Sequence, residues 1–209
     1  MISHRHKTIF VHVPKTAGQS IEQVFVDDLG LSWDEREILN LRYNDDPTSG
    51  PQHLGHLYAD EYVRNGHIDQ HRWDSYFKFA IVRNPYDRIL SEFRYRSFRK
   101  TGPLFWFLRK QYRDDYFDIA RHVVPQSRYL FDKNGTCLVN EIVKFEELKD
   151  RMPAIFQRVF GCSRSLPKRN ESTNGHRRLT RQQLGARNRK VIRDRFAEDF
   201  TKLGYDPDE

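Results

Sequence analysis

One short segment near the N-terminus gathers groups that could bind an oxyanion. Residues 14–20 directly follow the apolar run of residues 8–13. The segment offers a cation, further side-chain donors and backbone N–H groups, in the order Lys15, Thr16, Ala17, Gly18, Gln19 and Ser20. A helix that begins here would point its positive dipole end at the same spot. The residue types therefore predict a phosphate or sulfate site.

The segment differs from the phosphate-binding loop Gly-x-x-x-x-Gly-Lys-Ser/Thr of many nucleotide-binding proteins. Lys15 precedes Gly18 here instead of following it. A strand, a small polar loop and a helix also follow one another in many proteins that bind no anion at that point. An ordinary strand–helix turn with an exposed lysine is therefore the alternative interpretation.

A second segment repeats this arrangement farther along the chain. Residues 76–82 form another apolar run, and Arg83 follows it directly. Asn84 suits a helix N-cap, Pro85 the first helical position and Asp87 the first turn. The sequence therefore predicts a second strand–loop–helix unit with a cationic group at its edge.

Apolar runs and amphipathic segments alternate along the chain and predict an α/β fold with a parallel sheet. Strands are expected within residues 8–13, 76–82 and 138–145, and helices after Gly18, after Asn84, within 104–124, within 146–160 and after Thr180. A chain of 209 residues can form one domain, which we expect to cover residues 1–209. Parallel α/β sheets bind ligands at the carboxyl ends of their strands, so residues 14–20 and 83–91 are expected at one edge.

These two segments resemble the nucleotide motifs of a known family. Residues 10–20 resemble the 5′-phosphosulfate loop of sulfotransferases that use 3′-phosphoadenosine 5′-phosphosulfate (PAPS), above all the carbohydrate branch with the heparan sulfate 2-O-sulfotransferases. Residues 79–93 resemble the family's 3′-phosphate motif, in which an arginine ends a strand and a serine follows in the helix, here Arg83 and Ser91. Weaker similarities lie at residues 126–130, 143–148, 166–172 and 199–205.

The resemblance implies a sulfotransferase fold, with a P-loop-like parallel sheet flanked by helices, and PAPS as the sulfuryl donor. PAPS carries a phosphosulfate at one end and a ribose phosphate at the other, so a protein needs two oxyanion sites to hold it. Lys15 and the loop N–H groups would bind the sulfate and the 5′-phosphate, and Lys15 would also neutralise charge on the bridging oxygen. Arg83 and Ser91 would hold the 3′-phosphate. The products would be adenosine 3′,5′-bisphosphate and a sulfated hydroxyl, which we expect to belong to a carbohydrate.

The acceptor hydroxyl needs a general base, and the ordinary histidine pKa of about 6.5 suits this task near neutral pH. His56 in Leu54-Gly55-His56 matches the Gly-His segment in which the family carries its base. The 2-O-sulfotransferases resemble His-Gly-His, whereas here Leu54 takes the first position and His53 precedes it, which leaves a helper role for His53 open. A structural or solvated histidine is the alternative for His56. His12 lies within the first predicted strand and is interpreted as packing.

Two further segments could contact the ligands. Lys168, Arg169 and Ser172 lie where related enzymes close a loop over the nucleotide, and an ordinary basic surface loop is the alternative. Residues 94–113 contain Trp106 and several Phe and Tyr, which could stack on a sugar or pack in the core.

The charge pattern suits a polyanionic partner. The net charge is +7, and residues 164–195 hold eleven Lys or Arg against two acidic residues. Residues 88–113 hold eight basic residues against one acid. An acidic carbohydrate or nucleotide phosphates would suit such segments, and a solvated basic face is the alternative.

Two other functions compete with sulfuryl transfer. An NTP-dependent kinase or phosphotransferase would need the missing Gly-Lys-Ser/Thr and a magnesium-binding carboxylate. A non-catalytic polyanion- or RNA-binding protein would depend on residues 164–195 alone. Given the two nucleotide motifs, we expect no nucleic-acid partner. We also expect no metal, because the sequence shows neither a Cys/His cluster nor carboxylates at ligand spacing.

The chain shows no targeting or membrane segment. No apolar run approaches the about 18 residues of a membrane span, and residues 1–7 do not precede a signal-peptide core. Cys137 and Cys162 are expected to be free thiols, with a single bridge as the alternative. We therefore expect a soluble, cytoplasmic protein, or a lumenal one if an N-terminal anchor has been removed.

Overall fold

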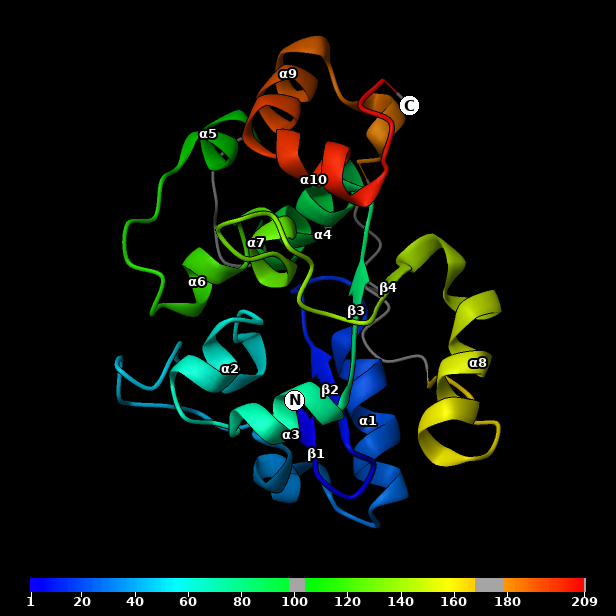
Figure 1. The fold of residues 1–209 in the computed structure, drawn as a ribbon. Helices are drawn as coiled ribbons and strands as arrows, with labels where there is room; N and C mark the ends of the chain where they lie inside the picture. The colour runs from blue at the N-terminus through cyan, green and yellow to red at the C-terminus, as the bar shows by residue number, and fades with distance from the viewer. Residues whose placement is uncertain (98–103, 168–178, 209) are drawn as a thin grey trace.

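The computed structural model describes residues 1–97, 104–167 and 179–208 and contains a four-stranded sheet in the order β1-β2-β3-β4 (Figure 1). The strands are β1 (Ile2–Ser3), β2 (Thr8–Val11), β3 (Phe77–Val82) and β4 (Glu141–Lys144). Strands β2, β3 and β4 are parallel, and β1 pairs antiparallel with β2. The predicted α/β fold with a parallel sheet is confirmed, and β1 adds an edge strand that the sequence did not predict.

Helices flank this sheet and cover the ends of its strands. The α-helices are α1 (Gly18–Asp28), α2 (Glu61–Arg64), α3 (Gln70–Ser75), α4 (Pro85–Ser97), α5 (Leu104–Arg109), α6 (Asp118–Arg121), α7 (Ser127–Leu130), α8 (Leu148–Phe160), α9 (Ala186–Arg195) and α10 (Ala197–Leu203). Short 3₁₀ helices are η1 (Trp33–Leu39), η2 (Leu54–His56), η3 (Phe145–Glu147) and η4 (Arg181–Gln183).

Both faces of the central strands are buried, which explains why their sequences are almost entirely apolar. Phe10 and Phe79 point to the face that packs against α1 and α8. Val11 and Ala80 point to the opposite face, where α2, α3 and α7 contribute Tyr and Trp side chains. Figure 1 shows α1 and α8 on one side of β3 and the α2–α3 segment on the other.

A third apolar cluster lies beyond the carboxyl ends of the strands. It joins α4, α5, α9 and α10 through buried side chains such as Leu90, Phe107, Ile192 and Phe200. Figure 1 shows these helices above the upper end of β3. The carboxyl ends of the strands, where ligands are expected, therefore face this layer of helices.

The predicted bounds of β3 and the predicted starts of α1 and α4 are confirmed within two residues, whereas the strand predicted within 138–145 and the helices predicted within 104–124 are shorter than expected. Asn84 caps α4, because its side-chain oxygen accepts a hydrogen bond from the Tyr86 amide at 3.0 Å. The strand predicted to reach Val13 ends at Val11, because the parallel ladder with β3 ends at the pair Val11–Ala80. The helix predicted from Glu146 begins as a 3₁₀ turn and becomes α8 at Leu148.

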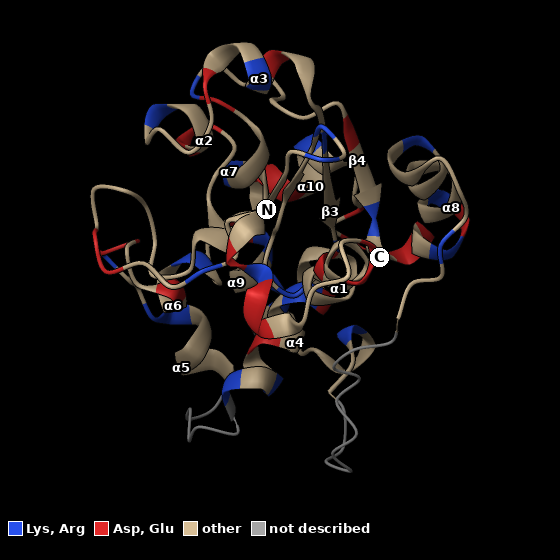
Figure 2. Ribbon diagram, turned by 90° about the horizontal axis from the view of Figure 1, so that it is seen from below, with Lys and Arg blue, Asp and Glu red and all other residues tan. Residues whose placement is uncertain are grey.

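Positive and negative side chains are interspersed in the described part of the molecule. Figure 2 shows Lys and Arg alternating with Asp and Glu along α3, α8 and other helices. Part of the basic segment 164–195 is neutralised locally, for example by the Lys190–Asp194 pair at 2.8 Å. Cys137 and Cys162 are both free and exposed, as predicted. None of the helices in the described ranges combines the length and apolar character that a bilayer span requires.

Candidate active site

The loop between β2 and α1 has a backbone shape that suits an anion. Lys15 and Ala17 have positive φ angles of 71° and 74°, whereas Thr16 between them does not. Alternation of this kind turns successive N–H groups into a concave nest for anions. Positive φ costs a non-glycine residue about 1–3 kcal/mol, so the surrounding structure must hold the loop in this shape. Helix α1 follows directly, so the positive end of its dipole lies at the loop.

The predicted loop donors differ in what they offer a ligand. Thr16 is fully buried, and its hydroxyl donates to the Val13 carbonyl at 2.7 Å. Its side chain therefore closes the loop, which leaves the backbone N–H as its contribution to an anion. Gln19 is exposed and Ser20 is buried, both in the first turn of α1.

Gly18 lies against the ring of His12. A Cβ atom at Gly18 would lie 1.9 Å from His12 Nε2, so no larger residue fits without moving the ring. His12 Nδ1 in turn lies 2.7 Å from Glu22 Oε1 on α1, and both side chains are buried. The interpretation of His12 as a packing residue is therefore incomplete, because Glu22 holds its ring against the loop between β2 and α1.

Lys15 lies in a surplus of positive charge. Its Nζ is 4.1 Å from the ring centre of Tyr95 on α4. Burial lowers the pKa of Lys15, Glu92 opposes this effect, and nearby arginines, Arg83 first among them, lower the pKa further. An anion bound beside Lys15 would relieve this repulsion.

Arg83 directly follows β3, and its backbone N–H and carbonyl are both hydrogen-bonded. Its amide donates to Gln126 Oε1 at 2.9 Å, and its carbonyl accepts from Gln126 Nε2 at 2.8 Å. The guanidinium lies 4.2 Å from the ring centre of Phe145. Its Nε is buried and has no hydrogen-bond partner among the described residues. An unsatisfied buried donor is costly, and a phosphate oxygen is a natural partner for it.

Ser91 lies two turns into α4 and is half-buried. The helix begins directly after Arg83 and Asn84, so the structure places the two predicted 3′-phosphate ligands on one continuous strand–helix unit. Their relation to a nucleotide stays a prediction.

His56 ends η2 and lies beside His12, next to the loop between β2 and α1. Its ring centre is 4.8 Å from that of His12, in an edge-to-face arrangement. Its Nδ1 lies 2.5 Å from Asp118 Oδ1 at the start of α6. The side chain keeps 14% exposure, and its Nε2 makes no hydrogen bond within the described part of the chain. His53 is farther away, with its ring centre 6.3 Å from that of His56.

The Asp118 carboxylate also faces a second imidazole. His122 Nε2 lies 3.1 Å from Asp118 Oδ2, and His122 Nδ1 lies 2.8 Å from Glu92 Oε2. Burial lowers the pKa of His56 to about 4, although Asp118 opposes this effect. Burial would also lower the pKa of His122, but Glu92 and Asp118 outweigh it and raise that pKa. The site therefore combines a neutral imidazole with one that tends to be protonated.

Metal binding is the other chemistry that such a cluster suggests. Ligand-type atoms of His56, Asp118 and His122 lie within 4.8 Å of one another. Ligands of a tetrahedral zinc ion, with bonds of about 2.0–2.1 Å, lie about 3.3 Å apart. His56 Nδ1 and Asp118 Oδ1 contact each other directly as a hydrogen-bonded pair. We therefore interpret the cluster as side chains that contact one another, with a hydrogen bond between His56 and Asp118 and an ion pair between Asp118 and His122. The sequence pattern did not reveal that these residues gather.

Arg88 connects the segments that form the site. This residue of α4 is 1% exposed, and its guanidinium donates to the carbonyls of Pro14 at 3.2 Å, His122 at 2.9 Å and Val124 at 2.9 Å. Arg88 thereby joins α4 to Pro14, where the loop between β2 and α1 begins, and to the backbone of residues 122–124.

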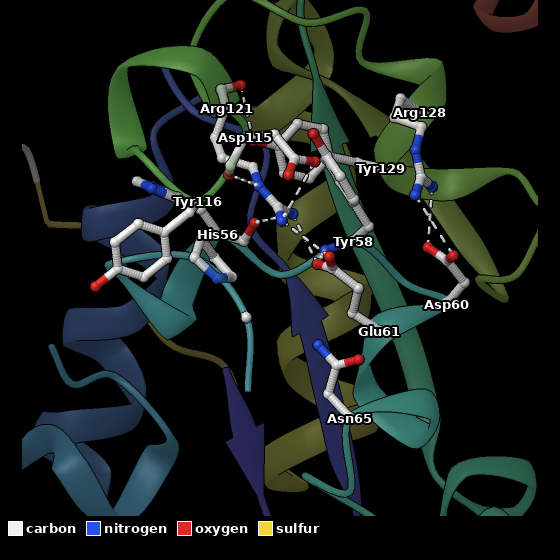
Figure 3. A network of polar contacts seen from close by, with 12 residues as sticks. His56, Tyr58, Asp60, Glu61, Asn65, Asp115, Tyr116, Arg121, Arg128 and Tyr129 are labelled. Atoms are coloured by element: carbon white, nitrogen blue, oxygen red, sulfur yellow. Dashed lines mark hydrogen bonds and ion pairs between the residues drawn. The ribbon is translucent and has the colours of Figure 1, made fainter. Parts of the chain in front are cut away.

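A second buried arginine supports the backbone near His56 (Figure 3). Arg121 makes two hydrogen bonds to Glu61, at 2.7 and 2.8 Å, and its Nη1 lies 3.5 Å from the His56 carbonyl oxygen. Its guanidinium also lies over the ring of Tyr58, 3.8 Å from the ring centre. Beside this network is a pocket of about 280 Å³ lined by Thr48, Glu61, Arg64, Asn65, Tyr116 and Arg121.

The sequence missed Asp118, His122 and Glu92 as site residues. Asp118 and His122 are four residues apart, a spacing that places two side chains on one face of a helix. That signal was available but pointed to no particular partner, because His56 lies in a distant segment. The predicted contacts of Lys168, Arg169 and Ser172 lie outside the described residues. Of the aromatic residues in 94–113, Phe107 packs in the core and Trp106 is exposed.

Comparisons with known proteins identify the family of this chain. A model of the Sulfotransferase family matches residues 1–206. Carbohydrate sulfotransferase 10 of Danio rerio is 26% identical over 145 residues, which cover 64% of this chain and 38% of that protein. The chain thus spans well under two thirds of the length of this curated relative. No solved structure matches the chain significantly. Because the family match covers nearly all of the chain, the protein belongs to the sulfotransferase family.

Proposed function

We propose that the protein transfers the sulfuryl group of PAPS to a hydroxyl of a carbohydrate. The observation that carries the proposal is the convergence of the Lys15 loop, Arg83 and His56 at the carboxyl ends of β2 and β3. These groups would bind the phosphosulfate, bind the 3′-phosphate and activate the acceptor, respectively. Family membership supports the reaction class.

The residues present fit both charged ends of the donor. The positive φ angles at Lys15 and Ala17 form an anion nest, and Gly18 lets the backbone lie close against His12. Arg83 offers a buried Nε without a partner. Because these features belong to two strand–loop–helix units of one sheet, they suit a ligand with an anion at each end.

The reaction is an in-line displacement at sulfur. The acceptor oxygen forms a bond to sulfur as the bond from sulfur to the bridging oxygen breaks. The electron pair of the broken bond stays on the bridging oxygen, which becomes a phosphate oxygen of adenosine 3′,5′-bisphosphate. Lys15 lies in the loop that would hold this oxygen, and its ammonium would stabilise the negative charge that develops there.

His56 would take the proton of the acceptor hydroxyl at Nε2. Its Nδ1 is engaged by Asp118, so Nε2 is the nitrogen left to accept a proton. The lowered pKa keeps the imidazole neutral at physiological pH, which is the form a base requires.

A carbohydrate acceptor is supported by the name of the relative from Danio rerio, a carbohydrate sulfotransferase. The pocket beside Arg121 adds a physical argument, because carboxylate, amide and hydroxyl side chains line it. Such groups form hydrogen bonds with sugar hydroxyls, and Tyr116 could contact a sugar ring. Arg121 connects this pocket to the backbone of His56.

Calorimetry and an activity assay test the proposal together. Wild-type protein should bind adenosine 3′,5′-bisphosphate and transfer labelled sulfate from PAPS to a carbohydrate acceptor. His56→Ala should lower turnover by about 10²–10⁴-fold, the usual contribution of general acid–base catalysis, without weakening the bisphosphate. His71→Ala is the matched control, because His71 is exposed on α3.

Three outcomes would contradict the proposal. Tight binding of Mg–ATP without binding of the bisphosphate would indicate a phosphotransferase. Salt-dependent binding of a polyanion that is unaffected by Lys15→Ala and His56→Ala would indicate a non-catalytic binding protein. Retention of most activity in His56→Ala would exclude His56 as the base.

A further inference from the structure

We propose that Asp118, His122 and Glu92 form a positioning chain that holds His56 in the tautomer required of a general base. The inference rests on the proposed function and deepens it, because it names the residues that prepare the base. None of the three needs to touch the donor or the acceptor. They act through His56 and are therefore positioning residues.

The first contact of the positioning chain is Asp118 against His56. Asp118 Oδ1 and His56 Nδ1 form a direct hydrogen bond in which the acceptor is a carboxylate. A carboxylate only accepts hydrogen bonds, so His56 must carry its proton on Nδ1. The lone pair is then on Nε2, the nitrogen without a partner among the described residues.

The second contact holds the carboxylate itself. Asp118 Oδ2 lies 3.1 Å from His122 Nε2, four residues along the chain, an ion-pair contact whose geometry is not that of a hydrogen bond. One carboxylate therefore faces two imidazoles, one through each oxygen. Asp118 cannot turn away from His56 without also leaving His122.

The third contact joins His122 to Glu92 through the other ring nitrogen. Its Nδ1 lies 2.8 Å from Glu92 Oε2, and Glu92 is 0% exposed. The other oxygen of Glu92 accepts a hydrogen bond from Arg96 Nε. His122 is hydrogen-bonded to Glu92 at Nδ1 and ion-paired with Asp118 at Nε2, so the two acids together favour its imidazolium form.

The other groups around His56 are also accounted for. His12 lies edge-to-face against its ring from the end of β2, and Glu22 on α1 holds His12. His53 lies on the same turn as His56. Arg121 on α6 contacts the carbonyl oxygen of His56. Of these groups, Asp118 alone accepts a hydrogen bond from the His56 ring in the described structure.

The positioning chain also ties the base to the nucleotide site. Glu92 directly follows Ser91 on α4, and Arg88 on the same helix donates to the His122 carbonyl at 2.9 Å. The helix that would carry the 3′-phosphate ligand therefore also sets the position of His122. A fixed distance between donor and base is what in-line transfer requires.

The first experiment measures the imidazole tautomer by ¹⁵N-correlated NMR at pH 7, without donor or acceptor. The His56 signal is assigned by its loss in His56→Gln. Wild-type protein should show His56 protonated at Nδ1, and Asp118→Asn should lose this preference. A wild-type His56 protonated at Nε2 would overturn the proposal, even if Asp118→Asn failed to fold.

The second experiment measures turnover against pH. Asp118→Asn should lower kcat about a hundredfold or more, with KM for PAPS and the affinity for bisphosphate unchanged. The acidic limb of the pH–rate profile of Asp118→Asn should move to lower pH, because the variant lacks the carboxylate that favours the imidazolium form of His56. His122→Gln should move the limb to higher pH, because a neighbouring cation has been removed. Asp34→Asn and His71→Gln, both exposed, are the controls.

Opposite shifts separate positioning from general support of the fold. Loss of stability alone would lower the amount of active protein without moving the two pH profiles apart. Shifts in the same direction, or no shifts, would overturn the proposal. The NMR result does not depend on catalysis, so failure of the proposed sulfuryl transfer would be recognised separately, as an inactive wild-type protein with the expected tautomer.

Discussion

Gly18 lets the loop between β2 and α1 lie directly against the ring of His12, which in turn contacts His56. The sequence marked Gly18 as part of an anion loop, and the structure adds that its missing side chain makes room for His12. His12 cannot move aside easily, because Glu22 holds its Nδ1 at 2.7 Å. The glycine is thus required by a neighbour as well as by the expected ligand.

Replacement of Gly18 by alanine should damage the loop. The new Cβ would lie 1.9 Å from His12 Nε2, so either the ring or the loop backbone must shift. We expect the affinity for adenosine 3′,5′-bisphosphate to fall at least about tenfold, or about 1.4 kcal/mol, in calorimetry. Gly185→Ala is the matched control, because no atom lies within 4 Å of a Cβ at that position. Equal affinities of the two variants would show that the close approach is not needed.

Arg83 should act only on the 3′-phosphate. Arg83→Ala should weaken adenosine 3′,5′-bisphosphate about tenfold or more, because a charge-assisted contact contributes about 1.5–3 kcal/mol. The same variant should bind adenosine 5′-monophosphate as the wild type does, because that ligand has no 3′-phosphate. If Arg83→Ala weakened both ligands equally, the guanidinium would support the fold and not the predicted contact.

At the scale of elements, α4 does more than the sequence indicated. Its start was predicted correctly from Asn84 and Pro85, because capping depends on residues that are neighbours in the chain. Its buried arginine was not recognised, because the three carbonyls that Arg88 contacts come from distant segments. The polar contacts of a helix are set by what packs against it.

Replacement of Arg88 by methionine should destabilise the protein strongly. The carbonyls of Pro14, His122 and Val124 would lose their donor, and Asp199 would lose a nearby opposite charge. We expect the free energy of unfolding to fall by about 3 kcal/mol or more, because each buried acceptor left without a donor costs about 1–3 kcal/mol. Urea denaturation measures this change. Arg151→Met, which removes an exposed ion pair on α8, should cost about 1 kcal/mol or less.

At the scale of the whole molecule, the buried histidines and acids make stability depend on pH. Burial lowers the pKa of His56 from 6.5 to about 4, so the unfolded chain takes up a proton that the folded protein resists in this range. Stability is therefore lost as the pH falls from about 6.5 to about 4. The raised pKa of His122 affects stability at higher pH. Its contribution to the free energy of unfolding is complete below pH 6.5 and is lost only as the pH rises through the raised pKa.

The acids add a second loss at lower pH. Burial would raise the pKa of Asp118 and of Glu92, but their histidine contacts outweigh burial and hold both pKa values below the ordinary range. Their contributions are present above the ordinary values of 3.8 and 4.5 and disappear as the pH falls through the lowered ones.

Thermal unfolding between pH 3 and pH 8 should show this dependence. His56→Gln should reduce the loss of stability between pH 6.5 and pH 4 while leaving the loss at lower pH in place, because glutamine does not titrate. Identical slopes in the wild type and His56→Gln would show that His56 is protonated as easily in the folded protein as in the unfolded chain.

The sequence by itself determined the two strand–loop–helix units, with Lys15, Gly18, Arg83 and Ser91 in order. Apolar runs, caps and turn residues act over a few neighbouring positions, so they can be read along the chain. The tertiary structure alone decided that Asp118 contacts His56, and that His122 and Glu92 follow in the same chain of contacts. Hydrogen bonds between side chains from separate segments exist only once those segments pack, and no local pattern specifies which of them meet.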